Sequence, residues 1–270
     1  MLVTLTIAGS DSLGGAGIEA DIKAMSSQGV HPAVAITAIT SQNSQRVAAI
    51  FPLPASVVIS QIDAILEDAT VSGAKLGMLY SSEIAESVAS RLKDEQFPIV
   101  VDPVLIAGIG DSLKTNDLST SIAKNVVPIA SLLTPNIPEA EELSGIEITN
   151  DQDVEEACRK LHAMGAEAVL IKGGHLAGPC IDTLYHDNKF FKVKVPRVEI
   201  RGHGGGCILS SLITANLAKG AKVWKAYLQA KMTLDKAISL HYAVGQGVPA
   251  ISPILQTYLD AETFKNSPKL

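Results

Sequence analysis

The sequence predicts an α/β fold, in which a central, mostly parallel sheet is covered by helices on both faces. Strand candidates alternate with segments of helical spacing along most of the 270 residues. The strand candidates are nearly continuous apolar runs, which is typical of strands buried on both faces. No linker, repeat or low-complexity segment divides the chain, so we expect a single domain over residues 1–270.

In the first half of the chain, three apolar strand candidates each precede a segment whose apolar residues recur at helical spacing. LVTLTIAG precedes GGAGIEADIKAMSSQG, AVAITAIT precedes SVVISQIDAILEDA, and AKLGML precedes a helix over Ser82–Lys93.

The second half continues this alternation and then changes it. PIVVDPV precedes a helix near Asp117–Lys124, ASLLTPN precedes the helix DVEEACRKLHAMG, and AVLIKGG is the next strand. IDTLYHD and KFFKVKV flank an HDNK turn, which predicts a hairpin. Two helices follow, one from the glycine run at Gly204 and one over Val223–His241.

The residues that could carry chemistry follow the predicted strands. In open α/β sheets, ligands bind at the carboxyl ends of the strands. The unusual residues of this chain cluster there, at Gly9–Gly17, Thr40–Asn43, Asp102–Val104, Thr134–Glu139, Lys172–His175 and Gly204–Cys207.

Composition excludes several classes of partner. The formal net charge is −6, so no global basic field exists to hold nucleic acid or an anionic membrane. No apolar stretch reaches membrane-spanning length and no basic leader begins the chain, so we expect a soluble, cytoplasmic protein. Cys158, Cys180 and Cys207 form no CxxC pair, so neither a disulfide framework nor a zinc site is indicated.

Three consecutive glycines, Gly204, Gly205 and Gly206, precede a predicted helix and indicate an anion site. The first amides of a helix lack partners, and glycine lets an oxyanion approach them. The P-loop pattern is excluded because the dipeptide Gly-Lys is absent. GAGIEA matches the dinucleotide fingerprint loosely, but no acid occurs between Asp21 and Asp63 to hold a ribose.

Cys207 directly follows these glycines. A thiol in the first turn of a helix is expected to have a lowered pKa, because the helix dipole favours the thiolate. A thiolate there could take the proton of an attacking hydroxyl group. The alternative is a small, buried helix residue without a chemical role.

A family resemblance joins these features. The motifs occur in the order seen in hydroxymethylpyrimidine/phosphomethylpyrimidine kinases of the ribokinase-like superfamily, which act in thiamine biosynthesis. They are TIAGSDSLGGAGIEADIKAMSSQGV, AITAITSQN, KLGML, VVDPV, LLTPNIPEAEELSG, VLIKGGHLAG and GHGGGCILSSLITANLAKG. The resemblance covers roughly Leu2 to Lys219. It implies a ribokinase-like fold, a homodimer, and phosphorylation of an aminopyrimidine alcohol and then of its monophosphate with ATP and Mg²⁺.

The resemblance also assigns roles to individual residues. It implies that the substrate pocket contains Gly9, Asp21, Gln42, Met78 and Val104. It implies that the catalytic turn comprises Gly204, Gly205, Gly206 and Cys207. It implies that the ATP phosphates lie near Asp102, Asn136, Glu139, Lys172 and His175, with Asp102 and Glu139 at the metal. Asn136 and Glu139 also fit a helix capping box, and both roles can hold together.

The chain departs from the family pattern around the catalytic turn. It reads GHGGGCI where members usually read THGTGCT, so Gly202, Gly205 and Ile208 replace hydroxyl-bearing residues. Gly108 stands where a lysine is usual. Two alternatives therefore remain open, a pyridoxal kinase of the same fold and a ligand-binding relative without catalysis. Gln42 favours the pyrimidine over pyridoxal, which lacks the amino group that an amide could bind.

Overall fold

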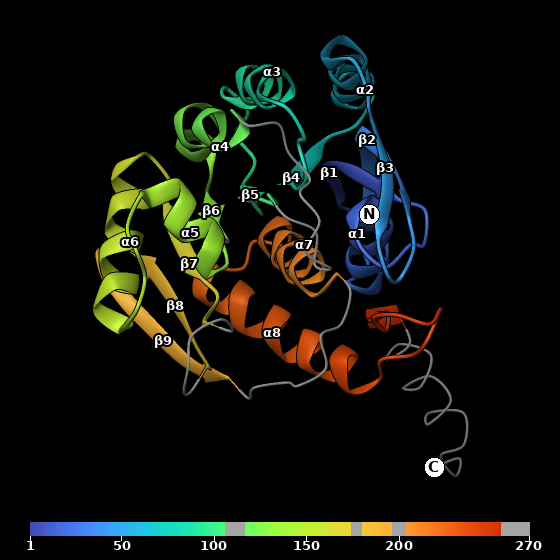
Figure 1. Ribbon diagram of the computed structural model, residues 1–270. Coiled ribbons are helices and arrows are strands. Elements are labelled where there is room, and N and C mark those ends of the chain that lie inside the picture. The colour runs from blue at the N-terminus through green and yellow to red at the C-terminus, as the bar shows by residue number, and fades with distance from the viewer. Residues whose placement is uncertain (106–116, 174–179, 196–203, 255–270) are drawn as a thin grey trace, which may run out of the picture.

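The protein is described by a computed structural model over residues 1–105, 117–173, 180–195 and 204–254. These residues form one nine-stranded sheet with helices on both faces, as predicted (Figure 1). The strand order is β3-β2-β1-β4-β5-β6-β7-β8-β9. The strands are β1 (Val3–Asp11), β2 (His31–Gln42), β3 (Val47–Pro52), β4 (Val71–Leu76), β5 (Ile99–Val101), β6 (Leu132–Leu133), β7 (Ala168–Ile171), β8 (Cys180–His186) and β9 (Lys189–Val195).

The central strands are parallel and the two edges are antiparallel. Strands β2, β1, β4, β5, β6 and β7 pair in parallel, whereas β3 pairs antiparallel with β2, and β8 with both β7 and β9. The predicted hairpin is β8–β9, and Asp187 and Asn188 make its two-residue turn with positive φ angles of 50° and 58°. Strand β3 was not predicted, because its short sequence VAAIFP lacks a clear alternation of apolar and polar residues.

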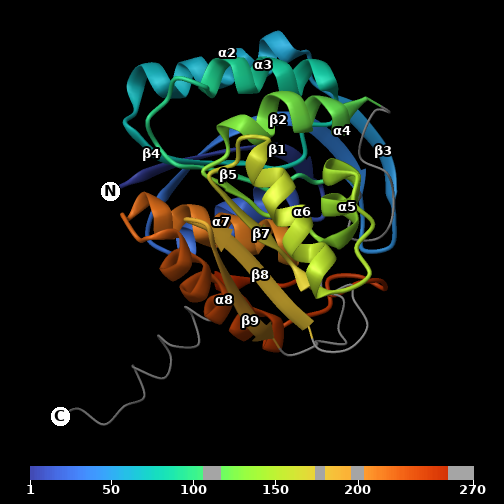
Figure 2. The ribbon, with the colours of Figure 1, turned by 90° about the vertical axis from the view of Figure 1, so that its left-hand side faces the viewer.

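The helices divide between the two faces (Figure 2). Helices α2, α3, α5 and α6 lie on one face with the short α4, and α1, α7 and α8 lie on the other. Neighbouring strand residues serve opposite cores, because Val101 and Leu133 face the first helix layer while Val100 and Leu132 face the second. The α-helices are α1 (Gly17–Ser27), α2 (Ala55–Asp68), α3 (Ser82–Leu92), α4 (Leu118–Ser121), α5 (Ile137–Ser144), α6 (Asp151–Ala163), α7 (Gly205–Ala218) and α8 (Val223–Ser239), and a π-helical and a 3-10 segment, η1 (Ile122–Val126) and η2 (Val127–Ile129), follow α4.

Helix α7 is the helix that begins at the predicted glycine turn. It packs against α1, α8 and the central strands β1, β4 and β5, and every residue from Ile208 to Leu217 is buried. A helix apolar around most of its circumference is expected at such a position. Its buried polar side chains, among them Ser210, Ser211 and Thr214, all hydrogen-bond within the protein.

The carboxyl ends of the parallel strands form the edge on which the predicted site residues meet. Asp11 and Gln42 end β1 and β2, and Asp102 directly follows β5. Lys172 follows β7 and forms an isolated bridge with Asn136. Among the described helices, none is long and apolar enough to cross a membrane.

Candidate active site

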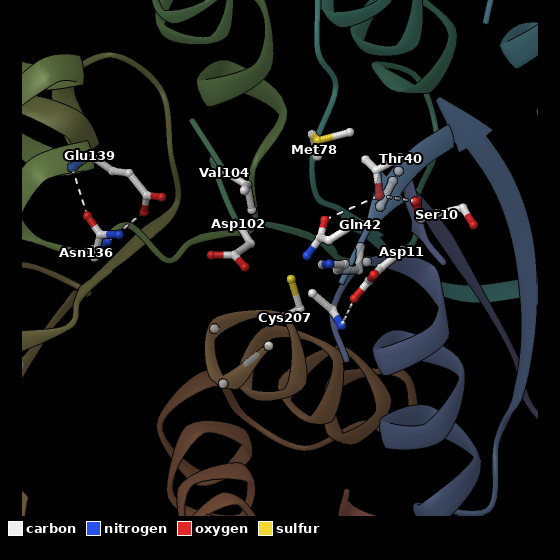
Figure 3. A pocket seen from close by; sticks show the side chains of 18 of the residues that line it. Ser10, Asp11, Thr40, Gln42, Met78, Asp102, Val104, Asn136, Glu139 and Cys207 are labelled. Atoms are coloured by element: carbon white, nitrogen blue, oxygen red, sulfur yellow. Dashed lines mark hydrogen bonds between the residues drawn. The ribbon is translucent and has the colours of Figure 1, made fainter. Parts of the chain in front are cut away.

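One cavity at this edge brings most of the predicted residues together (Figure 3). Asn136 and Glu139 lie at one end, Thr40 and Gln42 lie at the other, and Cys207 projects between them. The predicted residues that line the cavity are Gly9, Gln42, Met78, Asp102, Val104, Asn136, Glu139, Lys172, Gly204, Gly205, Gly206 and Cys207.

The three glycines of the turn have different reasons to be glycine. Gly204 has φ +83°, a backbone conformation that is strained for residues with a side chain. A Cβ there would also lie 2.0 Å from the carbonyl oxygen of Gly15, so only glycine fits. A Cβ on Gly205 or Gly206 would meet nothing closer than 3.6 Å. Both face the cavity in the first turn of α7, where backbone amides have no helical acceptor. The turn thus leaves open space beside these amides, and the anion site predicted there stays a prediction.

Cys207 is the third residue of α7, and the helix-dipole argument gave the wrong direction for its acidity. Burial raises the pKa of the Cys207 thiol to about 11, although the Lys75 ammonium opposes that rise. The Gly17 amide N–H, which donates toward the sulfur, also lowers the pKa. Burial of the thiol in the cavity thus outweighs the ammonium and the amide that favour the thiolate.

Asp102 and Lys172 form an ion pair beside the glycine turn. The Lys172 Nζ lies 3.0 Å from Asp102 Oδ1, and the two side chains are 18% and 3% exposed. Thr134 and Ser210 donate to the same carboxylate over 3.4 Å, near the limit for a hydrogen bond. Burial lowers the pKa of Lys172, but Asp102 and Glu139 more than offset this and raise it, so the amine is a cation.

Asn136 and Glu139 form a complete capping box at the start of α5. The Glu139 amide donates to Asn136 Oδ1, and the Asn136 amide donates to Glu139 Oε2, both over 2.9 Å. Burial raises the pKa of Glu139 to about 7, and the nearby Asp102 charge adds to that rise. The alternative of a helix cap is therefore confirmed, and the carboxylate still borders the cavity.

The chemistry of this acid pair suits magnesium. No group of three or more His, Cys, Asp or Glu side chains that could hold a metal occurs in the described part of the chain. Asp102 and Glu139 offer hard oxygen atoms and leave room for water and phosphate ligands, which Mg²⁺ prefers to an all-protein cage.

The opposite end of the cavity presents an amide. The Thr40 hydroxyl donates to Gln42 Oε1 over 3.3 Å and also lies 2.9 Å from the carbonyl oxygen of Ser10. The Ser12 hydroxyl holds the Gln42 backbone, since its oxygen lies 2.8 Å from both the amide nitrogen and the carbonyl oxygen. The end of β2 is thus fixed by the loop after β1.

An apolar surface completes this end. Met78 and Val104 belong to one small cluster with Ala38. A Cβ on Gly9 would lie 2.3 Å from Met78 Cε, so a side chain there would displace the end of Met78.

Asp21 is the predicted site residue that the structure places elsewhere. It is fully buried and does not line the cavity. Its carboxylate is occupied by Lys75, Thr6 and Ser211 from beneath the site. In this structure the Asp21 carboxylate therefore does not face the cavity, and its contact with substrate stays a prediction.

Three residues discussed from the sequence lie outside the described residues, and two residues that line the cavity had no predicted role. His175, Gly108 and Gly202 lie outside the described residues. Sequence reasoning gave no role to Asp11 or Lys75, which also line the cavity. Asp11 accepts hydrogen bonds from three amides of its own loop, at Leu13, Gly15 and Ala16. A lysine inside the apolar strand run AKLGML was a signal for Lys75 that could have been used.

Comparison with known proteins places the chain among vitamin kinases. A family model described as "Phosphomethylpyrimidine kinase" matches residues 11–252. A hydroxymethylpyrimidine/phosphomethylpyrimidine kinase of Haemophilus influenzae is 42% identical over 250 residues, which are 90% of this chain and 93% of that protein. The thiamine biosynthesis bifunctional protein ThiED of Geobacter sulfurreducens is 39% identical over 93% of this chain, which spans only 52% of that longer protein.

Solved structures agree on the fold. The phosphomethylpyrimidine kinase of Clostridium difficile superposes with a TM-score of 0.80 at 40% identity, covering 88% of this chain and 100% of the other. The pyridoxal kinase of Bacillus subtilis, solved as an ADP complex, superposes with a TM-score of 0.86 at 33% identity, covering 96% and 99%. Fold similarity alone therefore does not separate the two substrate classes.

Proposed function

This chain belongs to the phosphomethylpyrimidine kinase family, and from that premise we propose that it transfers the γ-phosphate of ATP to 4-amino-5-hydroxymethyl-2-methylpyrimidine. A second transfer to the resulting monophosphate would complete its part in thiamine biosynthesis. Both steps need the same arrangement, in which an acceptor oxygen faces the γ-phosphate in line with the leaving group.

One observation carries the proposal. The Cys207 thiol lies in a single cavity between an amide end at Gln42 and an acidic end at Asp102 and Glu139. An aminopyrimidine bound at the amide end would direct its hydroxymethyl group toward the thiol. The triphosphate would then approach the glycine turn from the acidic end.

The roles of the residues follow from this arrangement. Gln42 hydrogen-bonds the polar edge of the ring, and Met78 and Val104 pack against the ring itself. Cys207 takes the hydroxyl proton as general base. The amides of Gly205 and Gly206 stabilise charge that develops on the transferred group, and Lys172 neutralises phosphate charge. Magnesium held by Asp102 and Glu139 would supply further neutralisation of the phosphates.

Pyridoxal kinase activity is the second candidate, because a pyridoxal kinase shares the fold closely. The two substrates differ at the edge that Gln42 would bind. Gln42 favours the pyrimidine, since its amide can pair with adjacent ring nitrogen and amino groups. A homodimer and a cytoplasmic location belong to the same proposal, and light scattering and fractionation would test them.

The direct test is incubation with ATP, magnesium and each alcohol, followed by mass detection of one or two added phosphates. We expect two phosphates on the pyrimidine and little product from pyridoxal. Gln42→Leu should reduce kcat/KM for the pyrimidine about a hundredfold or more, because ring polar groups are left unpaired. Product from pyridoxal alone would favour the second candidate, and no product from either alcohol would refute a kinase of this class.

A further inference from the structure

A buried ion pair lies directly beneath the catalytic turn. The Lys75 Nζ is 2.9 Å from both oxygens of the Asp21 carboxylate, and both side chains are 0% exposed. Asp21 comes from α1 and Lys75 from β4, 54 residues apart in sequence. Desolvating two charges is costly, and a well-packed apolar pair is often as stable. Packing alone therefore gives no reason for charges at this place.

Two hydroxyl groups complete the coordination of the carboxylate. The Thr6 hydroxyl donates to Asp21 Oδ2 over 2.6 Å, and the Ser211 hydroxyl donates to Oδ1 over 2.7 Å. Ser211 lies four residues after Cys207, on the same side of α7. Asp21 thus connects the lysine, the strand β1 and the helix that carries the thiol.

Lys75 contacts Asp21 and also lines the cavity. It lines the cavity together with Cys207, and its ammonium favours the charged form of that thiol. The other charges that act on Cys207 are Asp21 beneath it, Asp102 after β5 and Lys172 after β7. The two aspartates oppose a thiolate, so the lysines are the groups that favour it.

We propose that Lys75 is the counter-charge of the Cys207 thiolate, and that Asp21 is a positioning residue that holds Lys75 charged and in place. The inference rests on the proposed function. The thiolate takes the hydroxyl proton of the substrate and becomes a thiol, while the freed oxygen bonds to the γ-phosphorus. The bond from that phosphorus to the bridging oxygen breaks, and ADP leaves. Lys75 keeps its proton throughout.

The first experiment needs no substrate. Iodoacetamide labels the thiols across pH 7–10, and mass spectrometry follows Cys207 with the buried Cys158 and Cys180 as internal controls. In Lys75→Met, labelling of Cys207 should slow about tenfold at each pH, as expected for a thiol pKa raised by one unit. Arg91→Met, which breaks a partly exposed pair with Asp63 elsewhere, is the matched control and should label like the parent.

The double variant Asp21→Asn/Lys75→Met is the control for misfolding of the single variant, because it leaves no unpaired buried charge. We expect it to fold, to label Cys207 more slowly than the parent and to remain slow in turnover. Parental labelling together with parental turnover in the folded double variant would overturn the proposal, because the pair would then serve packing alone.

Kinetics separate positioning from substrate binding. Asp21→Asn should lower kcat for the pyrimidine alcohol about tenfold or more, since an unpaired buried lysine loses its proton more easily. Its KM should stay near the parental value, and the rise of kcat with pH should move to higher pH. A raised KM with unchanged kcat would make Asp21 a substrate ligand and overturn the assignment. If the parent phosphorylates neither alcohol but Lys75→Met still slows labelling, the kinase function fails while the charge coupling stands.

Discussion

Two lysine–aspartate pairs flank the start of α7, and they differ in burial and in the number of close contacts. We call the fully buried pair closed and the partly exposed pair open. The Lys75–Asp21 pair has two contacts of 2.9 Å, two supporting hydroxyls and no exposure. The Lys172–Asp102 pair has one contact of 3.0 Å, two marginal hydroxyl contacts and a lysine that is 18% exposed. The Asp21 carboxylate has no acceptor position left for a ligand. The Asp102 carboxylate has weaker contacts and lines the cavity in which we propose that phosphate and metal bind, so the two pairs should respond differently when broken.

The largest effect is expected from the open pair. Asp102→Asn removes the charge that we propose binds the metal beside the phosphates, and kcat should fall about a thousandfold, which corresponds to roughly 4 kcal/mol of transition-state stabilisation. Steady-state kinetics at saturating magnesium and ATP would measure it. Asp63→Asn, on a partly exposed pair, is the control and should leave kcat unchanged. Parental turnover in Asp102→Asn would remove this carboxylate from the site.

The closed pair should dominate folding stability. Lys75→Met leaves the Asp21 carboxylate buried without its cation, a loss that typically costs about 3–5 kcal/mol. Lys172→Met should cost clearly less, because Asp102 borders the cavity and water can solvate it. Urea unfolding would compare the two variants, and Asp21→Asn/Lys75→Met should recover most of the loss. Equal losses in both single variants would abolish the distinction between closed and open pairs.

The sequence predicted which elements surround this site better than it predicted which residues are buried beneath it. Strand–helix alternation located the carboxyl edge, and local patterns gave the hairpin and the Asn136–Glu139 cap. Strand β3 was missed because its pattern is short and at the sheet edge. The resemblance placed Asp21 in the substrate pocket, and no local pattern spoke against it, because the residues that bury it, Lys75 and Ser211, are 54 and 190 positions away.

The acidity of Cys207 was misjudged for the same reason. The dipole of α7 is a local effect that the glycine run makes visible in the sequence. Burial by α1 and the sheet is a long-range effect, and here it is the stronger one. Local sequence therefore predicts which groups meet at a strand edge, while their ionisation depends on residues that only the fold brings near.

The smallest effect on stability is expected at Glu139, a buried acid near Lys172 and Asp102. Its pKa is raised from 4.5 to about 7 by burial, so between those values the native state holds a proton that the unfolded chain has lost. The group's contribution to stability therefore falls as pH rises through this range.

Glu139→Gln removes that cost and keeps the cap, since glutamine also accepts the Asn136 amide. In metal-free buffer the variant should be more stable than the parent at pH 8 by about 1–3 kcal/mol and nearly equal at pH 5. Its turnover should nevertheless fall by orders of magnitude, because the charge that destabilises the fold is the one that we propose binds magnesium. Urea unfolding at both pH values measures the first effect, and a variant less stable than the parent at pH 8 would show that Glu139 is a charged structural cap instead.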